Sequence, residues 1–183
     1  MKLIEKYKSN NFNERKKVKK VKYIVLHYTA MDNHFEAIDR LCSTKHKVSS
    51  HFLVSKSGNI YYLVDIRKRA WHAGESYWQG TTDINSNSIG IELDNNGSET
   101  YNKKQINSLF FLLSNITRIL KISKHNILGH SDISPFRKID PGPFFPWEFI
   151  SLKKISYLPT IRKIQKKQIR LFNKNKHLYL KKS

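Results

Sequence analysis

Cysteine, long apolar runs and internal repeats are scarce or missing in this chain of 183 residues. The only cysteine, Cys42, excludes an internal disulfide and a metal site built from several cysteines, and it favours a reducing compartment. No apolar run approaches the roughly 20 residues that a membrane-spanning helix needs. Residues 1–8 contain neither the apolar segment nor the small-residue cleavage site of a signal peptide. We therefore expect one compact domain with extensions, held together without disulfides.

Acidic residues are missing from the C-terminal part of the chain. Residues 151–183 carry eleven Lys and Arg and no Asp or Glu, and residues 1–22 carry nine bases against two acids. Residues 23–150 have fourteen bases and twelve acids, so most of the net charge of +20 lies in the two end segments. Basic ends favour nucleic acid, an anionic membrane or an acidic polymer as a partner. A general bias of the chain toward Lys, Ile and Asn explains them equally well.

The chain is predicted to have three parts. Residues 1–20 are expected to form an irregular basic arm, residues 21–150 a single folded domain, and residues 151–183 a basic extension with a weak amphipathic pattern. In the middle part, segments typical of strands alternate with segments typical of helices. This order favours an α/β domain with a central mixed β-sheet flanked by helices.

Apolar periodicity predicts the elements of this domain. We expect strands at 21–26, 88–93 and 126–128, a β-hairpin at 51–64, and helices at 34–42 and 102–121. The apolar face of the first helix is predicted to contain Phe35, Ile38, Leu41 and Cys42. Asn102 and Gln105 suit a capping box at the start of the second helix. Residues 66–88 are predicted to be a long connection without regular structure, and connections of that length are usually functional.

Four polar side chains lie inside or directly after apolar strands, where an unpaired charge is costly: His27, Glu92, His130 and Asp140. Two histidines and a carboxylate form a ligand set for catalytic zinc, with non-haem iron as the weaker alternative. Glu92 suits proton transfer, because an apolar strand would raise its pKa. Lys138, two residues before Asp140 in a proline-containing loop, can stabilise an oxyanion. The spacing has no compact His-Glu-x-x-His signature, so solvated loop charges remain an alternative to metal-assisted hydrolysis.

Five motifs occur in order along the chain. They lie at residues 25–30, 49–54, 69–74, 87–92 and 129–143. Together they resemble the zinc-dependent N-acetylmuramoyl-L-alanine amidases of the type-2 amidase family, whose fold is shared with peptidoglycan-recognition proteins. The similarity covers roughly residues 10–150 and is strongest for the branch of bacterial anhydro-muropeptide amidases.

The resemblance implies hydrolysis of the amide between N-acetylmuramic acid, including its 1,6-anhydro form, and L-alanine of the stem peptide. The reaction belongs to peptidoglycan degradation or recycling. One Zn²⁺ ion is implied, with the ligands His27, His130 and Asp140. Glu92 is implied as the catalytic acid and base, and Lys138 as the residue that stabilises the oxyanion.

Further residues in the motifs or close to them are predicted to bind substrate: Tyr28, His51, Trp71, His72 and Asn85. Another interpretation is open for four of them. His51 suits a core histidine and Asn85 suits a turn. Trp71 and His72 could instead have a structural role. Asp132 is expected to brace the loop or a ligand histidine.

The expected partner is a muropeptide or peptidoglycan, and no nucleic acid is expected. The basic ends are predicted to contact an anionic cell wall or membrane surface. Because no signal peptide is recognised, we expect the cytoplasm, with the periplasm as the alternative. A non-catalytic peptidoglycan-binding module on the same fold is disfavoured by the intact Glu92 and Asp140. A basic nucleic-acid-binding protein is disfavoured by the nearly neutral middle of the chain.

Overall fold

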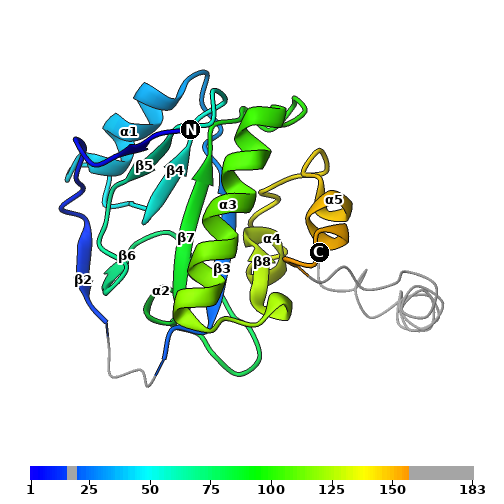
Figure 1. The fold of residues 1–183 in the computed structure, drawn as a ribbon. Helices are drawn as coiled ribbons and strands as arrows, with labels where there is room; N and C mark the ends of the chain where they lie inside the picture. Colours follow the sequence, from blue (N-terminus) through cyan, green and yellow to red (C-terminus); the bar gives the residue numbers. More distant parts are fainter. Residues whose placement is uncertain (16–19, 157–183) are drawn as a thin grey trace, which may run out of the picture.

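Strands and helices alternate along the protein (Figure 1). The computed structural model describes residues 1–15 and 20–156. In chain order the elements are β1 (Leu3–Ile4), β2 (Phe12–Glu14), β3 (Tyr23–Tyr28), α1 (His34–Cys42), β4 (Phe52–Val54), β5 (Ile60–Tyr62), β6 (Lys68–Ala70), α2 (Ile84–Asn87), β7 (Ser88–Leu93), α3 (Lys103–Leu120), the 3-10 helix η1 (Lys124–Asn126), β8 (Ile127–Gly129), α4 (His130–Ile133) and α5 (Trp147–Leu152).

Six strands form a central sheet in the order β1-β5-β4-β7-β3-β8. Strand β3 pairs in parallel with both β7 and β8, and β4 pairs in parallel with β7. Strand β5 pairs antiparallel with β4 and parallel with β1, which makes the sheet mixed. Strands β2 and β6 form a separate antiparallel pair. The predicted α/β domain with a central mixed sheet is confirmed, as is the hairpin of β4 and β5.

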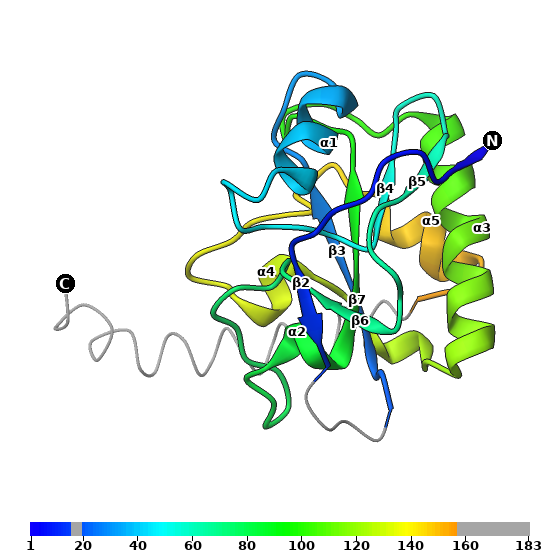
Figure 2. The same cartoon turned by 90° about the vertical axis from the view of Figure 1, so that its left-hand side faces the viewer.

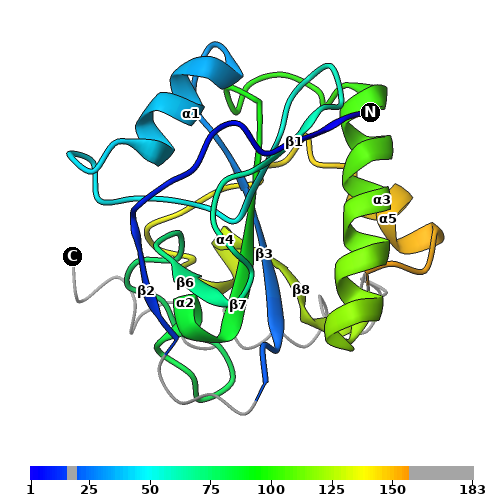
Figure 3. The same ribbon diagram turned by 60° about the vertical axis from the view of Figure 1, so that its left-hand side comes forward.

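Different elements cover the two faces of the sheet. Helix α3 runs along one face with α5 beside it, whereas α2 and the β2–β6 pair lie on the opposite side (Figures 2 and 3). Side chains of β3 alternate between the faces: Ile24 and Leu26 join the large core cluster that includes α3, and Tyr23 and Val25 join a smaller cluster. Because both of its faces are buried, the sequence of this strand is almost continuously apolar.

Helix α3 holds the sheet through an apolar stripe and one buried amide. The stripe includes Ile106, Leu109, Leu113 and Ile116. Asn102 caps the helix by accepting the backbone N–H of Lys104. The predicted capping box is absent at this helix start, because the side-chain amide of Gln105 instead donates to the carbonyl oxygens of Val54 and Asp94. Gln105 therefore connects the helix to the ends of β4 and β7.

The N-terminal residues belong to the sheet structure, so the prediction of an irregular arm over residues 1–20 is wrong for β1 and β2. The guanidinium of Arg15 anchors this segment. It donates to the carbonyl oxygens of four residues at 2.8 to 3.0 Å, namely Ile66, Asn85, Ser86 and Ser88. Only arginine has five donors in a planar fork, which suits it to this set of acceptors.

Two smaller expectations also change. In α1, Phe35 is 59% exposed, and the buried face consists of Ala37, Ile38 and Leu41. The connection 66–88 contains β6 and α2, so it is partly regular. The predicted amphipathic pattern after residue 156 lies outside the described residues. Within residues 1–15 and 20–156, no helix is both long and apolar enough to cross a bilayer.

Candidate functional site

Three parallel strands bring the predicted site residues to one edge of the sheet. His27 in β3 is the register partner of Glu92 in β7, so both side chains point to the same face. Strand β8 pairs with β3 up to Gly129, which places the next residue, His130, beside His27. Asp140 comes from the loop that follows α4. Residues that are far apart in the sequence therefore meet because β3 lies between β7 and β8.

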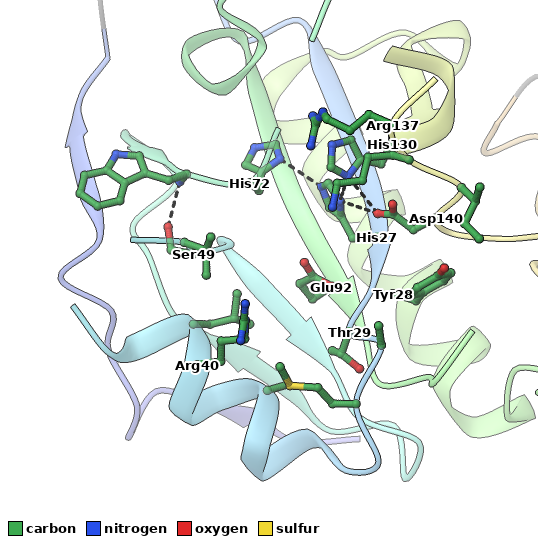
Figure 4. Close-up of a pocket in the computed structure, with 18 residues that line it drawn as sticks. His27, Tyr28, Thr29, Arg40, Ser49, His72, Glu92, His130, Arg137 and Asp140 are labelled. Carbon is green, nitrogen blue, oxygen red and sulfur yellow. Dashed lines mark hydrogen bonds and ion pairs between the residues drawn. The ribbon is translucent and has the colours of Figure 1, made fainter. Parts of the chain in front are cut away.

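The side chains of His27, His130 and Asp140 form a buried cluster (Figure 4). The two histidine Nδ1 atoms lie 3.0 Å apart. The Asp140 Oδ2 atom lies 2.9 Å from Nδ1 of His27 and 3.0 Å from Nδ1 of His130. Each residue offers one ligand atom, so the three predicted ligands form a group that can hold one metal ion.

The chemistry of these donors fits a divalent metal. Nε2 of His130 lies 3.1 Å from the Ala73 carbonyl oxygen, so Nε2 carries the proton and Nδ1 keeps its lone pair. Burial lowers the pKa of His27 to about 4, although contact with Asp140 opposes this. Burial would raise the pKa of Asp140, but contacts with His130 and His27 outweigh burial and hold it below its usual range. Two neutral imidazoles and one carboxylate form a zinc-type set, whose tetrahedral ligands lie about 3.3 Å apart.

Glu92 is the carboxyl group beside this cluster that has no ligand role. Its Oε2 atom is buried and has no hydrogen-bond partner among the described residues. Burial raises its pKa well above the usual value, the charge of Asp140 adds to this, and Lys138 partly opposes it. A carboxyl group with a raised pKa is suited to take a proton from one reacting group and give it to another.

A cavity of about 680 Å³ lies over the cluster. Its lining includes the predicted chemical groups His27, Glu92, His130, Lys138 and Asp140. Three of the predicted substrate-binding residues also line it, namely Tyr28, Trp71 and His72. The opposite wall comes from α1 and the loop before it.

Two predicted substrate-binding residues, His51 and Asn85, do not line this cavity. His51 is fully buried, with its Nδ1 accepting the backbone N–H of Gly90. The side-chain oxygen of Asn85 accepts the backbone N–H groups of His72 and Ala73. Both residues therefore have internal hydrogen-bond partners, which favours the structural interpretation left open for them over contact with substrate.

Three other polar residues lie at the cavity or in the loop beside it. Asp132 braces the loop, as expected, by accepting the Gly129 N–H at 2.7 Å. Sequence reasoning missed Arg40 and Arg137, which both line the cavity. Arg137 is the neighbour of Lys138 in the last motif, so its position in the sequence could have indicated that it lines the site. Arg40 lies on the polar side of α1, where a cavity residue has the same pattern as a solvated one.

Comparison with known proteins agrees with this geometry. The N-acetylmuramoyl-L-alanine amidase family matches residues 17–143. The chain belongs to this family. N-acetylmuramoyl-L-alanine amidase AmiD of Escherichia coli K12 is 36% identical over 161 residues, which cover 79% of the chain and 57% of AmiD. The 1,6-anhydro-N-acetylmuramyl-L-alanine amidase AmpD of Haemophilus influenzae is 42% identical over 107 residues, which cover 56% of each protein. The chain thus spans little more than half the length of these relatives.

Solved amidase structures share the fold. E. coli AmiD, in complex with anhydro-N-acetylmuramic acid-L-Ala-D-γ-Glu-L-Lys, superposes with a TM-score of 0.73 at 32% identity, covering 86% of this chain and 71% of AmiD. AmpDh3 of Pseudomonas aeruginosa, in complex with anhydromuramic pentapeptide, gives a TM-score of 0.71 at 32% identity, covering 85% of this chain and 68% of that one. The amidase fold expected from the sequence motifs is therefore confirmed.

Proposed function

We propose that this amidase hydrolyses the amide bond between the lactyl group of N-acetylmuramic acid and L-alanine of the stem peptide, with zinc as its metal. The observation that carries the proposal is the buried His27–His130–Asp140 group in one cavity with Glu92, whose buried Oε2 atom has no hydrogen-bond partner among the described residues. The relatives named above support the substrate class, because AmiD and AmpDh3 were solved with anhydro-muropeptides. We extend the proposal to the 1,6-anhydro form of the sugar and to recycling in the cytoplasm.

The chain's own residues have separate tasks in this reaction. His27, His130 and Asp140 would hold the zinc ion, which lowers the pKa of a bound water and polarises a carbonyl. Glu92 takes a proton from the attacking water and gives it to the departing nitrogen of L-alanine. The Lys138 ammonium stabilises the negative charge that develops on the lactyl carbonyl oxygen. The carbon–nitrogen bond breaks, leaving a lactyl carboxylate and the free amine of the peptide.

Mass spectrometry of the products tests this proposal. Anhydro-muramyl tripeptide and intact sacculi are incubated in parallel with the wild type, with the wild type plus chelator, and with Glu92→Ala. We expect peptide release by the wild type, loss of release with chelator, and a decrease of roughly 10²–10⁴-fold in Glu92→Ala with zinc still bound. Full activity of Glu92→Ala would contradict the proposed mechanism. Binding without release by the wild type would favour a non-catalytic peptidoglycan-binding module.

A further inference from the structure

His72 lies behind the metal-binding group, on the far side of His27 from Asp140 (Figure 4). Its side chain is buried, and its backbone N–H is fixed by the side-chain oxygen of Asn85 at 3.0 Å. The ring packs directly on Gly90 of β7, where an added Cβ would lie 2.4 Å from Cγ of His72. The ring position therefore requires glycine at 90, and the surroundings hold it against His27.

Hydrogen bonds running away from the metal-binding group set the direction of the protons on Ser88, on His72 and on Nε2 of His27. The Ile84 carbonyl can only accept, so the Ser88 hydroxyl donates to it at 2.7 Å. The Ser88 oxygen then accepts from Nε2–H of His72 at 3.1 Å. Nδ1 of His72 is left with a lone pair, which accepts Nε2–H of His27 at 3.1 Å. This bond opposes the alternative tautomer, in which Nδ1–H of His27 would donate to Asp140 Oδ2 at 2.9 Å, and it favours a His27 Nδ1 without a proton.

We propose that His72 is a positioning residue that fixes His27 as its Nε2–H tautomer and so makes His27 Nδ1 available to the metal. The inference rests on the proposed function only in that the His27–His130–Asp140 group binds zinc; it does not depend on the substrate. The two histidine ligands are held by different acceptors. His130 donates to the Ala73 carbonyl, whereas His27 donates to a second imidazole. Removing such an outer partner typically weakens metal binding.

The test compares His72→Leu, which has no acceptor, with His72→Gln, whose amide has an acceptor for His27 and a donor for Ser88. His46→Leu makes the same change at an exposed histidine. Zinc affinity is measured by chelator competition, and the His27 tautomer of the metal-free protein by long-range ¹H–¹⁵N NMR. We expect zinc binding to weaken roughly 10–100-fold in His72→Leu, to recover largely in His72→Gln, and to be unchanged in His46→Leu. The NMR spectra should show one His27 tautomer in the wild type and a mixture in His72→Leu.

Wild-type zinc affinity in folded His72→Leu, or a single Nε2–H tautomer of His27 in that variant, would overturn the proposal. Should His72→Leu fail to fold, Ser88→Ala removes the acceptor that orients His72 but keeps the ring, and it should also give mixed His27 tautomers. A single tautomer there would equally overturn the proposal. These readouts use no substrate, so a wild type that binds zinc but releases no peptide would contradict the proposed amidase activity and leave the role of His72 intact.

Discussion

Glu92 is held by the fold where a negative charge is poorly solvated. One of its carboxylate oxygens is buried and has no partner among the described residues, and the nearby Asp140 adds repulsion. An ionised Glu92 therefore destabilises the metal-free protein, while its raised pKa suits proton transfer. The position of Glu92 thus lowers the stability of the folded protein but favours the proton transfer of the proposed reaction.

We predict that Glu92→Gln stabilises the metal-free protein at pH 8 and not at pH 4. Because the folded pKa is raised above the unfolded value of 4.5, ionisation lowers wild-type stability as pH rises through the folded pKa, and below 4.5 there is no effect. Removing an unpartnered buried charge should give about 1–3 kcal/mol, or a rise in melting temperature of about 2–4 °C per kcal/mol.

Thermal melts of the wild type, Glu92→Gln and the exposed control Glu75→Gln at both pH values check this expectation. A lower melting temperature for Glu92→Gln than for the wild type at pH 8 would show that the carboxylate is stabilised by its surroundings.

At the scale of elements, helix α3 meets the turn of the β4–β5 hairpin at Gly58. The hydroxyl of Ser108 donates to the Gly58 carbonyl at 2.7 Å. Gly58 has a φ of +86°, and an added Cβ would lie 2.8 Å from the carbonyl oxygen of Lys104 in the helix. The helix can approach the hairpin this closely only because the turn residue has no side chain.

Gly58→Ala should lower the free energy of unfolding by about 2–4 kcal/mol, since a left-handed backbone and a contact with the helix backbone both oppose the methyl group. Gly80→Ala is the matched control, because Gly80 has a φ of +82° but nothing within 4 Å of an added Cβ. The control should lose only about 1–2 kcal/mol from the backbone. Urea unfolding measures both, and equal losses would mean that the helix contact contributes nothing.

Elements differ in how far the sequence predicts them. Strands β3 and β7 and helix α3 are long enough for apolar periodicity to place them. Strands β1, β2 and β6 have two or three residues, and they exist because distant segments pair with them. The same reasoning applies within the site: the motifs identify His51 and Asn85 as polar residues near it, but only the folded chain shows that their partners are internal.

At the scale of the whole molecule, charge and chemistry are separated along the chain. The site lies within residues 23–150, where bases exceed acids by only two, whereas residues 151–183 carry eleven bases and no acid. Basic segments attract anionic polymers over about a Debye length, roughly 8–10 Å at physiological salt. We therefore predict that the C-terminal segment attracts an anionic cell wall by its charge.

Replacing the eleven Lys and Arg of residues 151–183 by Gln should strongly weaken cosedimentation with sacculi at low salt. Turnover of a soluble anhydro-muropeptide should stay within about twofold of the wild type, because the residues to which we assign the reaction are unchanged in this variant. Wild-type protein at high salt is the control and should behave like the variant in sedimentation. Salt-insensitive cosedimentation of the wild type would rule out attraction by charge.

The wide sequence separation of the metal-binding residues also has a consequence for biosynthesis. His27 and Asp140 are 113 positions apart. At roughly 5–20 residues per second, the ribosome needs about 6–23 s to add the last of these residues after the first. No metal site of this composition exists during that interval, because β8 and the following loop have not been made. If this group binds zinc as proposed, the metal can be acquired only late in synthesis, after almost the whole domain has been made.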